Sequence, residues 1–546
     1  MNVVHGVASG RWWDRLGVLL VVILLTAVAL TFRDYGITVD EEVQNEYGKM
    51  LLSFYVTGFA DRTAFSYLNL YYYGGLFDLL AALLNLISPF GEYETRHLLG
   101  GLCGVWGVIG AGLLARRLAG PRAGFLAMLL LAVTATYYGH AFANPKDAPF
   151  AAAMLWVLYG ICRVLEEFPR PRWQTAALLG VTLGFALAIR IGALLALAWL
   201  AVAAIIALGL QWRRHRDSRR TVRDAARFAV KLLPALPVAY ALTAVFWPWA
   251  VLEPANPVRA LAMFSKFPID LDTLYAGTWY KAAQLPASYL AGYLLVKLPE
   301  LVLAGLLAAV IGVLLRRPGT GSIAQRATWV AIVFAAVAPV VAFAVKKPTA
   351  YNEMRHFLFV VPPFVVIAAF GLDRAWSWAR AVAPACGAAY GLALAALAAF
   401  HVTTLVRLHP YQYVDYNVLT GGVRGAVGRY ELDYWGAAMD AAALQLAAHV
   451  QREFDAGKPR RDYTVSFCGS EMGTTYHFPP YLKAEKIRWR ETDFYIYMKH
   501  GYCGTTTLGG KQIGEVRRLG IPLAVVEDLR GMKLPPATSR DASDSR

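Results

Sequence analysis

The sequence predicts a polytopic α-helical membrane protein with a small α/β domain near its C-terminal end. Of its 546 residues, 57% are hydrophobic and only 16% are charged, and the mean hydropathy is +0.43. A soluble protein cannot bury that much apolar surface. The apolar residues also gather in runs of about 20, which is the length that crosses a bilayer as a helix.

About eleven apolar runs are long enough to span a membrane. We expect the first to be a signal anchor, because no small-residue cleavage site follows it. The runs lie near residues 16–32, 97–115, 122–140, 147–164, 174–190, 191–211, 228–247, 290–315, 327–345, 357–371 and 382–406.

A further apolar stretch, residues 71–87, is short and contains Asp78 and Asn85. If it does not span, the most basic connections all fall on the side of the N-terminus, as the positive-inside rule requires. Those connections are residues 116–122, 163–172, 213–227, 316–326 and 373–380. We therefore predict an interfacial or re-entrant helix at 71–87 within a long first outer loop, 33–96. The N-terminus is then cytoplasmic, and everything after about residue 406 is outside.

The formal net charge of +16 does not indicate a nucleic-acid-binding protein. Its Lys and Arg residues cluster in short loops between apolar runs, which is typical of membrane orientation signals and lipid contact. The chain has no GxxxxGK[ST] phosphate loop, zinc-ligand spacing, GxSxG elbow or convincing internal repeat. An ATP-driven pump is therefore not favoured.

The last part of the chain is more polar and predicts a separate domain. Residues 463–467 and 493–498 have the composition of strands, and 437–454 that of a helix. We predict a transmembrane domain over 1–436, a soluble α/β domain over 437–533 and a disordered tail over 534–546. Cys468 and Cys503 both fall in the soluble domain, where an oxidising compartment would allow them to bridge, but two cysteines do not decide it.

Two acidic segments are predicted to share the outer face. Asp40, Glu41 and Glu42 follow the first span, and Asp147 ends the polar island NPKD at 144–147. A carboxylate in a membrane-surface cleft can accept a proton from a substrate hydroxyl. The alternative is structural, because Asp40 could cap a helix over 41–55, and Pro and Asp are common where a helix begins.

Two cationic positions on the same face suit a phosphate. Arg190 interrupts the apolar stretch 173–212, and at the outer tip of a helical hairpin it would present a planar guanidinium. At the bilayer centre it would cost roughly 2.5–3.5 kcal/mol. Arg355 and His356 open a later span, where cations are unfavourable unless an anion is bound. Lipid headgroups are the alternative partner for these residues.

The segments VDEEVQNEYGKMLL, YYYGGLFDLLAALL and NPKDAPFAAA, with an Arg-led span between the last two, resemble the GT-C superfamily of integral-membrane glycosyltransferases. The likeness covers about residues 1–430 and is strongest to the protein O-mannosyltransferase and aminoarabinose transferase group. The chain departs from the pattern in having the extra acid Glu42, and Arg190 in place of the Lys usual in the aminoarabinose branch. The segment HPYQYVDYNVLTGGVRGAVGRYELDYWG resembles bacterial members, and this resemblance does not indicate a substrate.

This resemblance implies roles for eight residues. Asp40, Glu41 and Asp147 would be catalytic, with Asp40 as the base and Asp147 supporting the acceptor side. The residues that would contact the lipid phosphate are Arg96, Lys146, Arg190, Arg355 and His356. No cofactor is required, and a divalent metal between the acids and the phosphate is left open.

The implied function is a glycosyltransferase of the bacterial inner membrane. It would move a hexose or pentose from a polyprenyl-phosphate donor to a hydroxyl of a lipid, glycan or protein on the non-cytoplasmic face, with inversion. A transporter or flippase for lipid-linked glycans is the alternative, since it would use the same cations without needing a base. A non-catalytic scaffold is a third hypothesis, but it leaves Arg190 unexplained.

Overall fold

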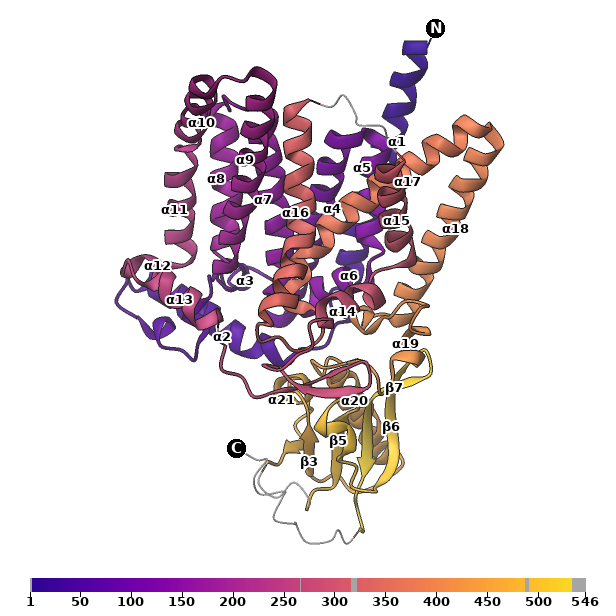
Figure 1. Cartoon of the computed structure of the whole chain (residues 1–546). Helices are drawn as coiled ribbons and strands as arrows, with labels where there is room; N and C mark the ends of the chain where they lie inside the picture. Colours follow the sequence, from indigo (N-terminus) through magenta and orange to yellow (C-terminus); the bar gives the residue numbers. More distant parts are fainter. Residues whose placement is uncertain (1, 266, 316–321, 487–490, 533–546) are drawn as a thin grey trace.

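The computed structural model describes residues 2–265, 267–315, 322–486 and 491–532. A large helical domain is followed by a small domain built on a five-stranded sheet (Figure 1). The N-terminus of α1 (Asn2–Thr31) lies at the end of the helices opposite the small domain. The predicted fold class is confirmed, while the predicted tail at 534–546 and part of the basic connection 316–326 lie outside the described residues.

Within the described residues, eight helical segments are long and apolar enough to cross a membrane. They are Gly10–Thr31 of α1, α4 (Glu92–Ala119), α7 (Asp147–Glu166), η3 with α9 (Ile191–Leu194, Leu195–His215), α10 with α11 (Ser218–Leu232, Ala235–Phe246), α16 (Ile323–Lys346), η4 with α17 (Arg355–Val360, Val361–Val382) and α18 (Pro384–Leu408).

Two bent helix pairs are candidates for further spans. They are α5 (Pro121–Ala132) with α6 (Ala135–Ala143), bent by 60°, and α14 (Tyr289–Lys297) with α15 (Glu300–Leu314), bent by 112°. The remaining expected span, 174–190, corresponds to α8 (Trp173–Leu187), which has 15 residues. The count of about eleven spans therefore stays a prediction.

The sharp bend between α14 and α15 differs from the single span predicted over 290–315. Pro299 has no N–H to continue a helix and keeps Leu298 extended, at φ −75° and ψ 135°. Lys297, at the end of α14, is buried and forms an ion pair with Glu353. A Lys at this position would be costly in lipid, so α14 turns into the protein at the end that faces the small domain (Figure 1).

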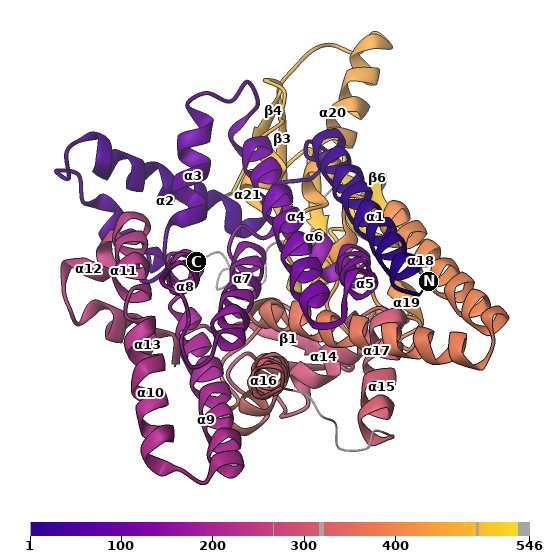
Figure 2. The same cartoon turned by 90° about the horizontal axis from the view of Figure 1, so that it is seen from above.

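Helix α7 is the centre of the helical domain. It lies between α4, α8 and α16 when the molecule is viewed from above (Figure 2). Most of its residues are buried, whereas α1 and α18 bury few of theirs. An apolar helix that is enclosed by others belongs to the core of a bundle. Asp147 begins this central helix, and its position is therefore set by the packing of the whole domain.

Residues 33–96, which we predicted to be the first outer loop, form two helices, α2 (Val39–Val56) and α3 (Leu76–Asn85). Helix α3 has 10 residues, about half of what a span needs, as predicted for 71–87. Helix α2 begins after Thr38 rather than after Asp40, so the structural alternative that made Asp40 the N-cap is wrong. The loop also contains the short 3-10 helices η1 (Thr63–Phe65) and η2 (Leu70–Tyr72).

Two connections carry the remaining short elements of the helical domain. Between α11 and α14 these are α12 (Pro248–Leu252), α13 (Asn256–Ser265), β1 (Asp272–Tyr275) and β2 (Thr278–Lys281), and after α18 they are η5 (Gln412–Val414) and α19 (Gly422–Ala426). Strands β1 and β2 form an antiparallel hairpin.

The small domain has a mixed sheet in the order β4-β3-β5-β7-β6. Strands β4, β3 and β5 are parallel, and β7 and β6 are antiparallel to their neighbours. Its elements are α20 (Met439–Asp455), β3 (Tyr463–Cys468), α21 (Glu471–Thr475), β4 (Leu482–Ala484), β5 (Phe494–Met498), η6 (Tyr502–Thr505), β6 (Lys511–Arg518) and β7 (Ile521–Asp528). The helix predicted at 437–454 and both predicted strands are confirmed, and Cys468 is bridged to Cys503.

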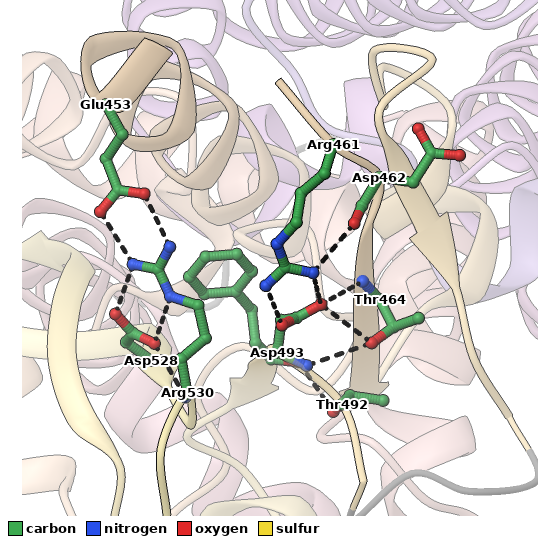
Figure 3. A network of polar contacts seen from close by, with 9 residues as sticks. Glu453, Arg461, Asp462, Thr464, Thr492, Asp493, Asp528 and Arg530 are labelled. Carbon is green, nitrogen blue, oxygen red and sulfur yellow. Dashed lines mark hydrogen bonds and ion pairs between the residues drawn. The ribbon is translucent and has the colours of Figure 1, made fainter. Parts of the chain in front are cut away.

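Ion pairs join α20 to the sheet at one end of the small domain (Figure 3). Arg530, just after β7, donates to both carboxylate oxygens of Glu453 on α20, at 2.7 and 2.8 Å, and also to Asp528. Arg461 and Thr464 bind Asp493 in the same way between β3 and β5. The Glu453 contacts fix α20 against its sheet, and the Asp493 contacts join β3 to β5.

The segment that leads from the helical domain into α20 packs against the chain just before Asp40. A Cβ on Gly36 would lie 2.2 Å from the carbonyl oxygen of Ala437, so only glycine allows this approach. The Trp435 carbonyl accepts a hydrogen bond from the amide of Val39 at 3.3 Å. The start of α2 is therefore held between the helical domain and the C-terminal part of the chain.

Candidate active site

Asp40 and Arg355 form an ion pair at the end of the helical domain that faces the small domain. The Arg355 guanidinium donates to Asp40 Oδ2 at 2.5 Å, and the Arg355 side chain is 6% exposed while that of Asp40 is 36% exposed. Burial by itself raises the pKa of the Asp40 carboxyl, but Arg355 and the nearby charge of Lys146 together hold it below its usual value. Asp40 is thus an accessible, ionised carboxylate.

Asp147 and Arg190 form a second pair beside the first. Arg190 Nη2 lies 2.6 Å from Asp147 Oδ1, and the Asn144 side-chain amide donates to Asp147 Oδ2 at 2.8 Å. The Asn144 side-chain oxygen in turn accepts from the amides of Lys146 and Asp147, at 3.1 and 2.8 Å. The polar island therefore folds into a local turn that aims Asp147 at Arg190.

Lys146 and Tyr73 connect these two pairs. The Lys146 ammonium lies 3.8 Å from the centre of the Tyr73 ring, and Arg190 lies over the same ring at 5.4 Å. Burial lowers the pKa of Lys146 to about 8, which Asp78, Asp40 and Asp147 partly oppose. The lysine is therefore a buried cation whose proton is held less tightly than usual.

A tight turn places Tyr73 at the site. The amides of Gly74 and Leu76 donate to the carbonyls of Ile189 and Ala188, at 3.1 and 3.0 Å, where α8 ends just before Arg190. A Cβ on Gly74 would lie 2.0 Å from the carbonyl oxygen of Ala188. Only glycine lets the first outer loop approach the α8–η3 connection this closely.

A largely apolar cavity of about 300 Å³ opens beside Arg190. Arg190 and His356 are the basic side chains among the described residues that line it, and His356 Nδ1 is buried without a hydrogen-bond partner. The other described residues that line it include Tyr73, Phe150, Leu195, Phe264, Tyr351 and Phe359. Such a cavity suits an apolar chain that ends in an anion.

Glu41 does not join this group, although it is next to Asp40. Its Oε2 accepts hydrogen bonds from the amide and hydroxyl of Thr38, at 2.8 and 3.1 Å, and its Oε1 lies 3.0 Å from His97 Nε2. Both oxygens are used to begin α2 and to hold it against α4. The structure thus gives Glu41 a structural position, and its catalytic role stays a prediction.

Arg96 is also separated from the cavity. It is 1% exposed, pairs with Asp78 Oδ1 at 2.6 Å and lies over the Phe77 ring. This pair joins α3 to α4, because a buried Arg must find its counter-charge close by. Its predicted contact with a lipid phosphate stays a prediction, as do those of Lys146, Arg190, Arg355 and His356. Of these four, Arg190 and His356 line the cavity.

Three residues of the site were not among the predicted ones: Tyr73, Asn144 and Trp435. The Arg355 guanidinium carbon lies 4.8 Å from the centre of the Tyr351 ring and 5.6 Å from that of Trp435. Tyr73 and Trp435 stand in the quoted motifs YYYGG and DYWG, which was the available signal. Among the described residues, no group of three or more His, Cys, Asp or Glu side chains is arranged to hold a metal ion.

The family model described as dolichyl-phosphate-mannose-protein mannosyltransferase matches residues 76–249 of this chain. No curated protein sequence is significantly similar to it. The match covers 174 of the 546 residues, and over that segment it agrees with the resemblance of the motifs to the GT-C superfamily of integral-membrane glycosyltransferases. Within that class its match is to the protein mannosyltransferases, and the matched span includes Arg96, Lys146, Asp147 and Arg190 but neither Asp40 nor Arg355.

Several solved structures are similar at low identity and with TM-scores below 0.5. The crystal structure of ArnT from Cupriavidus metallidurans in the apo state has 14% identity and a TM-score of 0.48, over 95% of this chain and 98% of that one. The crystal structure of the same protein bound to undecaprenyl phosphate has 14% identity and a TM-score of 0.47, over 97% of this chain and 100% of that one. The archaeal oligosaccharyltransferase AglB from Archaeoglobus fulgidus was solved in complex with an inhibitory peptide and a dolichol-phosphate. It has 13% identity and a TM-score of 0.47, over 84% of this chain and 62% of that one.

Proposed function

We propose that this protein transfers a sugar from a polyprenyl-phosphate donor to an acceptor hydroxyl at the non-cytoplasmic face of a bacterial inner membrane. The observation that carries the proposal is the pairing of two carboxylates, Asp40 and Asp147, with two arginines, Arg355 and Arg190, beside an apolar cavity. The name of the matched family, which contains a lipid-phosphate sugar, supports the donor class.

In the proposed reaction Asp40 takes the proton of the acceptor hydroxyl. The hydroxyl oxygen then bonds to the anomeric carbon in line with the departing lipid phosphate, so the configuration at that carbon inverts. Asp147, which is held by Asn144 and Arg190, supports the acceptor side. General-base assistance of this kind contributes typically about 10²–10⁴-fold to the rate.

The cations stabilise the leaving group. Negative charge builds up on the lipid phosphate as the glycosidic bond breaks, and Arg190 and Arg355 can then bind it more strongly than they bind the intact donor. His356 lines the cavity, and Lys146 lies against the ring of Tyr73, which also lines it, so both can add hydrogen-bond donors. The apolar walls of the cavity would hold the first part of the polyprenyl chain. Polar groups aimed at a phosphate from apolar walls are the expected recognition pattern for such a donor.

The test uses purified protein in nanodiscs with a panel of polyprenyl-phosphate hexoses and pentoses. Free polyprenyl phosphate is followed by mass spectrometry with and without an acceptor extract from native membranes. We expect release that requires both a matching donor and an acceptor. If no donor is cleaved while a labelled lipid-linked glycan changes leaflets, the enzyme proposal fails and the flippase hypothesis replaces it.

A further inference from the structure

A second buried polar cluster lies behind Arg355. At its centre Lys297 Nζ pairs with Glu353 Oε1 at 2.6 Å, and both side chains are 0% exposed. The Lys297 ammonium also donates to the carbonyl of Tyr413 at 2.8 Å and lies 3.8 Å from the centre of the Tyr416 ring. Lys297 ends α14, Glu353 precedes η4, and the tyrosines belong to residues 409–438, which connect the two domains. Three distant parts of the chain therefore meet here.

Burying this ion pair lowers the free energy of unfolding. Removing two charges from water costs several kcal/mol for each ion, and apolar residues of similar size would often be at least as stable. Glu353 Oε2 is buried without a hydrogen-bond partner among the described residues, and so is Glu431 Oε2 nearby. Burial raises the pKa of both carboxyl groups to about 7. Stability alone does not explain the cluster.

The backbone at Glu353 is strained as well. Asn352 and Glu353 have φ values of +55° and +62°, in the left-handed region that L residues other than Asn and Asp seldom adopt. A residue held there costs about 1–3 kcal/mol and persists only where its surroundings enforce it. The Glu353 carbonyl accepts a hydrogen bond from Tyr289 at 3.0 Å, and its carboxylate is held by Lys297. Arg355 follows two residues later.

The connecting segment clamps the same turn. The Tyr416 hydroxyl lies 3.0 Å from Glu353 Oε1 and 2.6 Å from the carbonyl oxygen of Glu431. Glu431 Oε1 accepts from the Thr273 hydroxyl at 2.7 Å and from the Leu274 amide at 3.0 Å, which ties the β1–β2 hairpin to the cluster. Trp435 of this segment lies against Arg355 itself. Each contact restrains the direction in which Arg355 leaves the turn.

We propose that the Lys297–Glu353 pair, clamped by Tyr416 and Glu431, is a positioning device that aims Arg355 at both Asp40 and the donor phosphate. Lys297 and Glu353 are thus positioning residues, and the motif from His409 to Gly436 completes the site from outside the helical bundle. The inference rests on the proposed function, because it is the donor phosphate that Arg355 is positioned to bind.

The test compares Glu353→Gln, Lys297→Met and the double variant with Asp373→Asn. Asp373→Asn is the control, because it breaks another largely buried ion pair, that of Asp373 with Arg122 at 2.7 Å. Asp373 lies in α17, eighteen residues beyond Arg355. Each single variant leaves one buried charge unpaired and lowers the thermal unfolding midpoint. The double variant removes both charges and recovers that midpoint. A purely structural pair would then also recover full activity.

Positioning predicts a different result for the double variant. Its KM for the donor remains higher than that of wild type, and its kcat/KM for the donor is about 10–100-fold lower than that of wild type. A misplaced binding group reduces the rate by about this factor. The KM for the acceptor does not change, and Asp373→Asn behaves as wild type in donor KM. A double variant with wild-type kinetics and a recovered midpoint overturns the proposal.

Hydrogen–deuterium exchange gives a second readout that needs no turnover. Without donor, the backbone amides of residues 351–356 exchange faster in the double variant than in wild type or Asp373→Asn. If wild type cleaves no donor, the proposed function fails, while faster exchange still establishes the positioning of the Arg355 turn. Unchanged exchange in the double variant removes the positioning role whatever the activity.

Discussion

The Arg355 guanidinium donates a hydrogen bond to Asp40 across 315 residues of sequence. In our account this pair is the state before the donor binds, in which the base is neutralised by the cation that later binds phosphate. A donor phosphate competes with Asp40 for Arg355. As Arg355 turns toward the phosphate, it lowers the pKa of Asp40 less, and the carboxylate becomes a stronger base when an acceptor is present.

Replacing Arg355 should move the acidic limb of the pH–rate profile. Activity rises with pH as Asp40 loses its proton, and burial raises the pKa of Asp40 while Arg355 lowers it. Arg355→Gln removes the larger of the two cationic effects that lower this pKa, the other being that of Lys146, so the acidic limb of kcat/KM shifts to higher pH. Arg355→Lys keeps the charge and shifts it less. If the acidic limb has the same apparent pKa in wild type and in Arg355→Gln, Asp40 is not the titrating base.

Arg190→Met should lower kcat/KM for the donor by about 10²–10³-fold, as expected when one stabilising donor to a developing anion is lost. Arg190→Lys keeps the charge but not the bidentate geometry and should be intermediate. Arg259→Met, an exposed Arg on α13, is the matched control and should leave the kinetics unchanged. If steady-state kinetics give Arg190→Met the same kcat/KM for the donor as this control, Arg190 does not bind the donor.

Gly74→Ala should damage both fold and activity. The new Cβ would lie 2.0 Å from the Ala188 carbonyl oxygen, so the turn that carries Tyr73 must move away from Lys146 and Arg190. Overpacking of this kind costs about 1–3 kcal/mol. Gly209→Ala, in α9, is the control, because a Cβ added at Gly209 meets nothing within 4 Å among the described residues. If Gly74→Ala and Gly209→Ala have the same thermal unfolding midpoint and the same turnover, the close approach of Gly74 to the Ala188 carbonyl is contradicted.

The small domain should depend on Glu453 for stability toward acid. Hydrogen bonds from Arg530 and Lys458 lower the pKa of Glu453 to about 2, against an ordinary value of 4.5. A carboxyl with a lowered pKa contributes stability that is complete above its unfolded pKa and is lost as the pH falls from about 4.5 to about 2. Glu453→Gln should therefore destabilise the protein at pH 7, by roughly 1.5–3 kcal/mol for hydrogen bonds to a charged group. Thermal unfolding monitored at pH 7 and pH 3 should show the difference shrink at the lower pH; an equal difference at both would refute this assignment.

The sequence allowed most of the fold to be predicted. Apolar length and the positive-inside rule were sufficient to exclude 71–87 as a span and to place Asp40, Asp147, Arg190 and Arg355 at one end of the helices. The strands at 463–467 and 493–498 were predictable because their side chains fit a pleated, half-buried surface. Each of these inferences depended on residues that are close in sequence.

What the sequence did not predict depends on partners far apart in the chain. Arg96 lies against Asp78 and Glu41 against His97, and no local pattern reveals such pairs. The spacing of Thr38 and Glu41 did match a capping box, which was the signal for a structural role of Glu41. Lys297, inside an apolar run, was a sign of a buried ion pair, but its partner Glu353 could only be found in three dimensions.

The central claim is that Asp40 is the base while Arg355 binds the donor phosphate. The most direct measurement takes Asp40→Asn, with Glu42→Gln from the same helical turn as control, and determines both polyprenyl-phosphate binding and sugar transfer. We predict that Asp40→Asn binds the lipid phosphate at least as tightly as wild type, because Arg355 no longer has a competing carboxylate, and yet loses most turnover. Glu42→Gln should retain both. Wild-type turnover in Asp40→Asn would contradict the account.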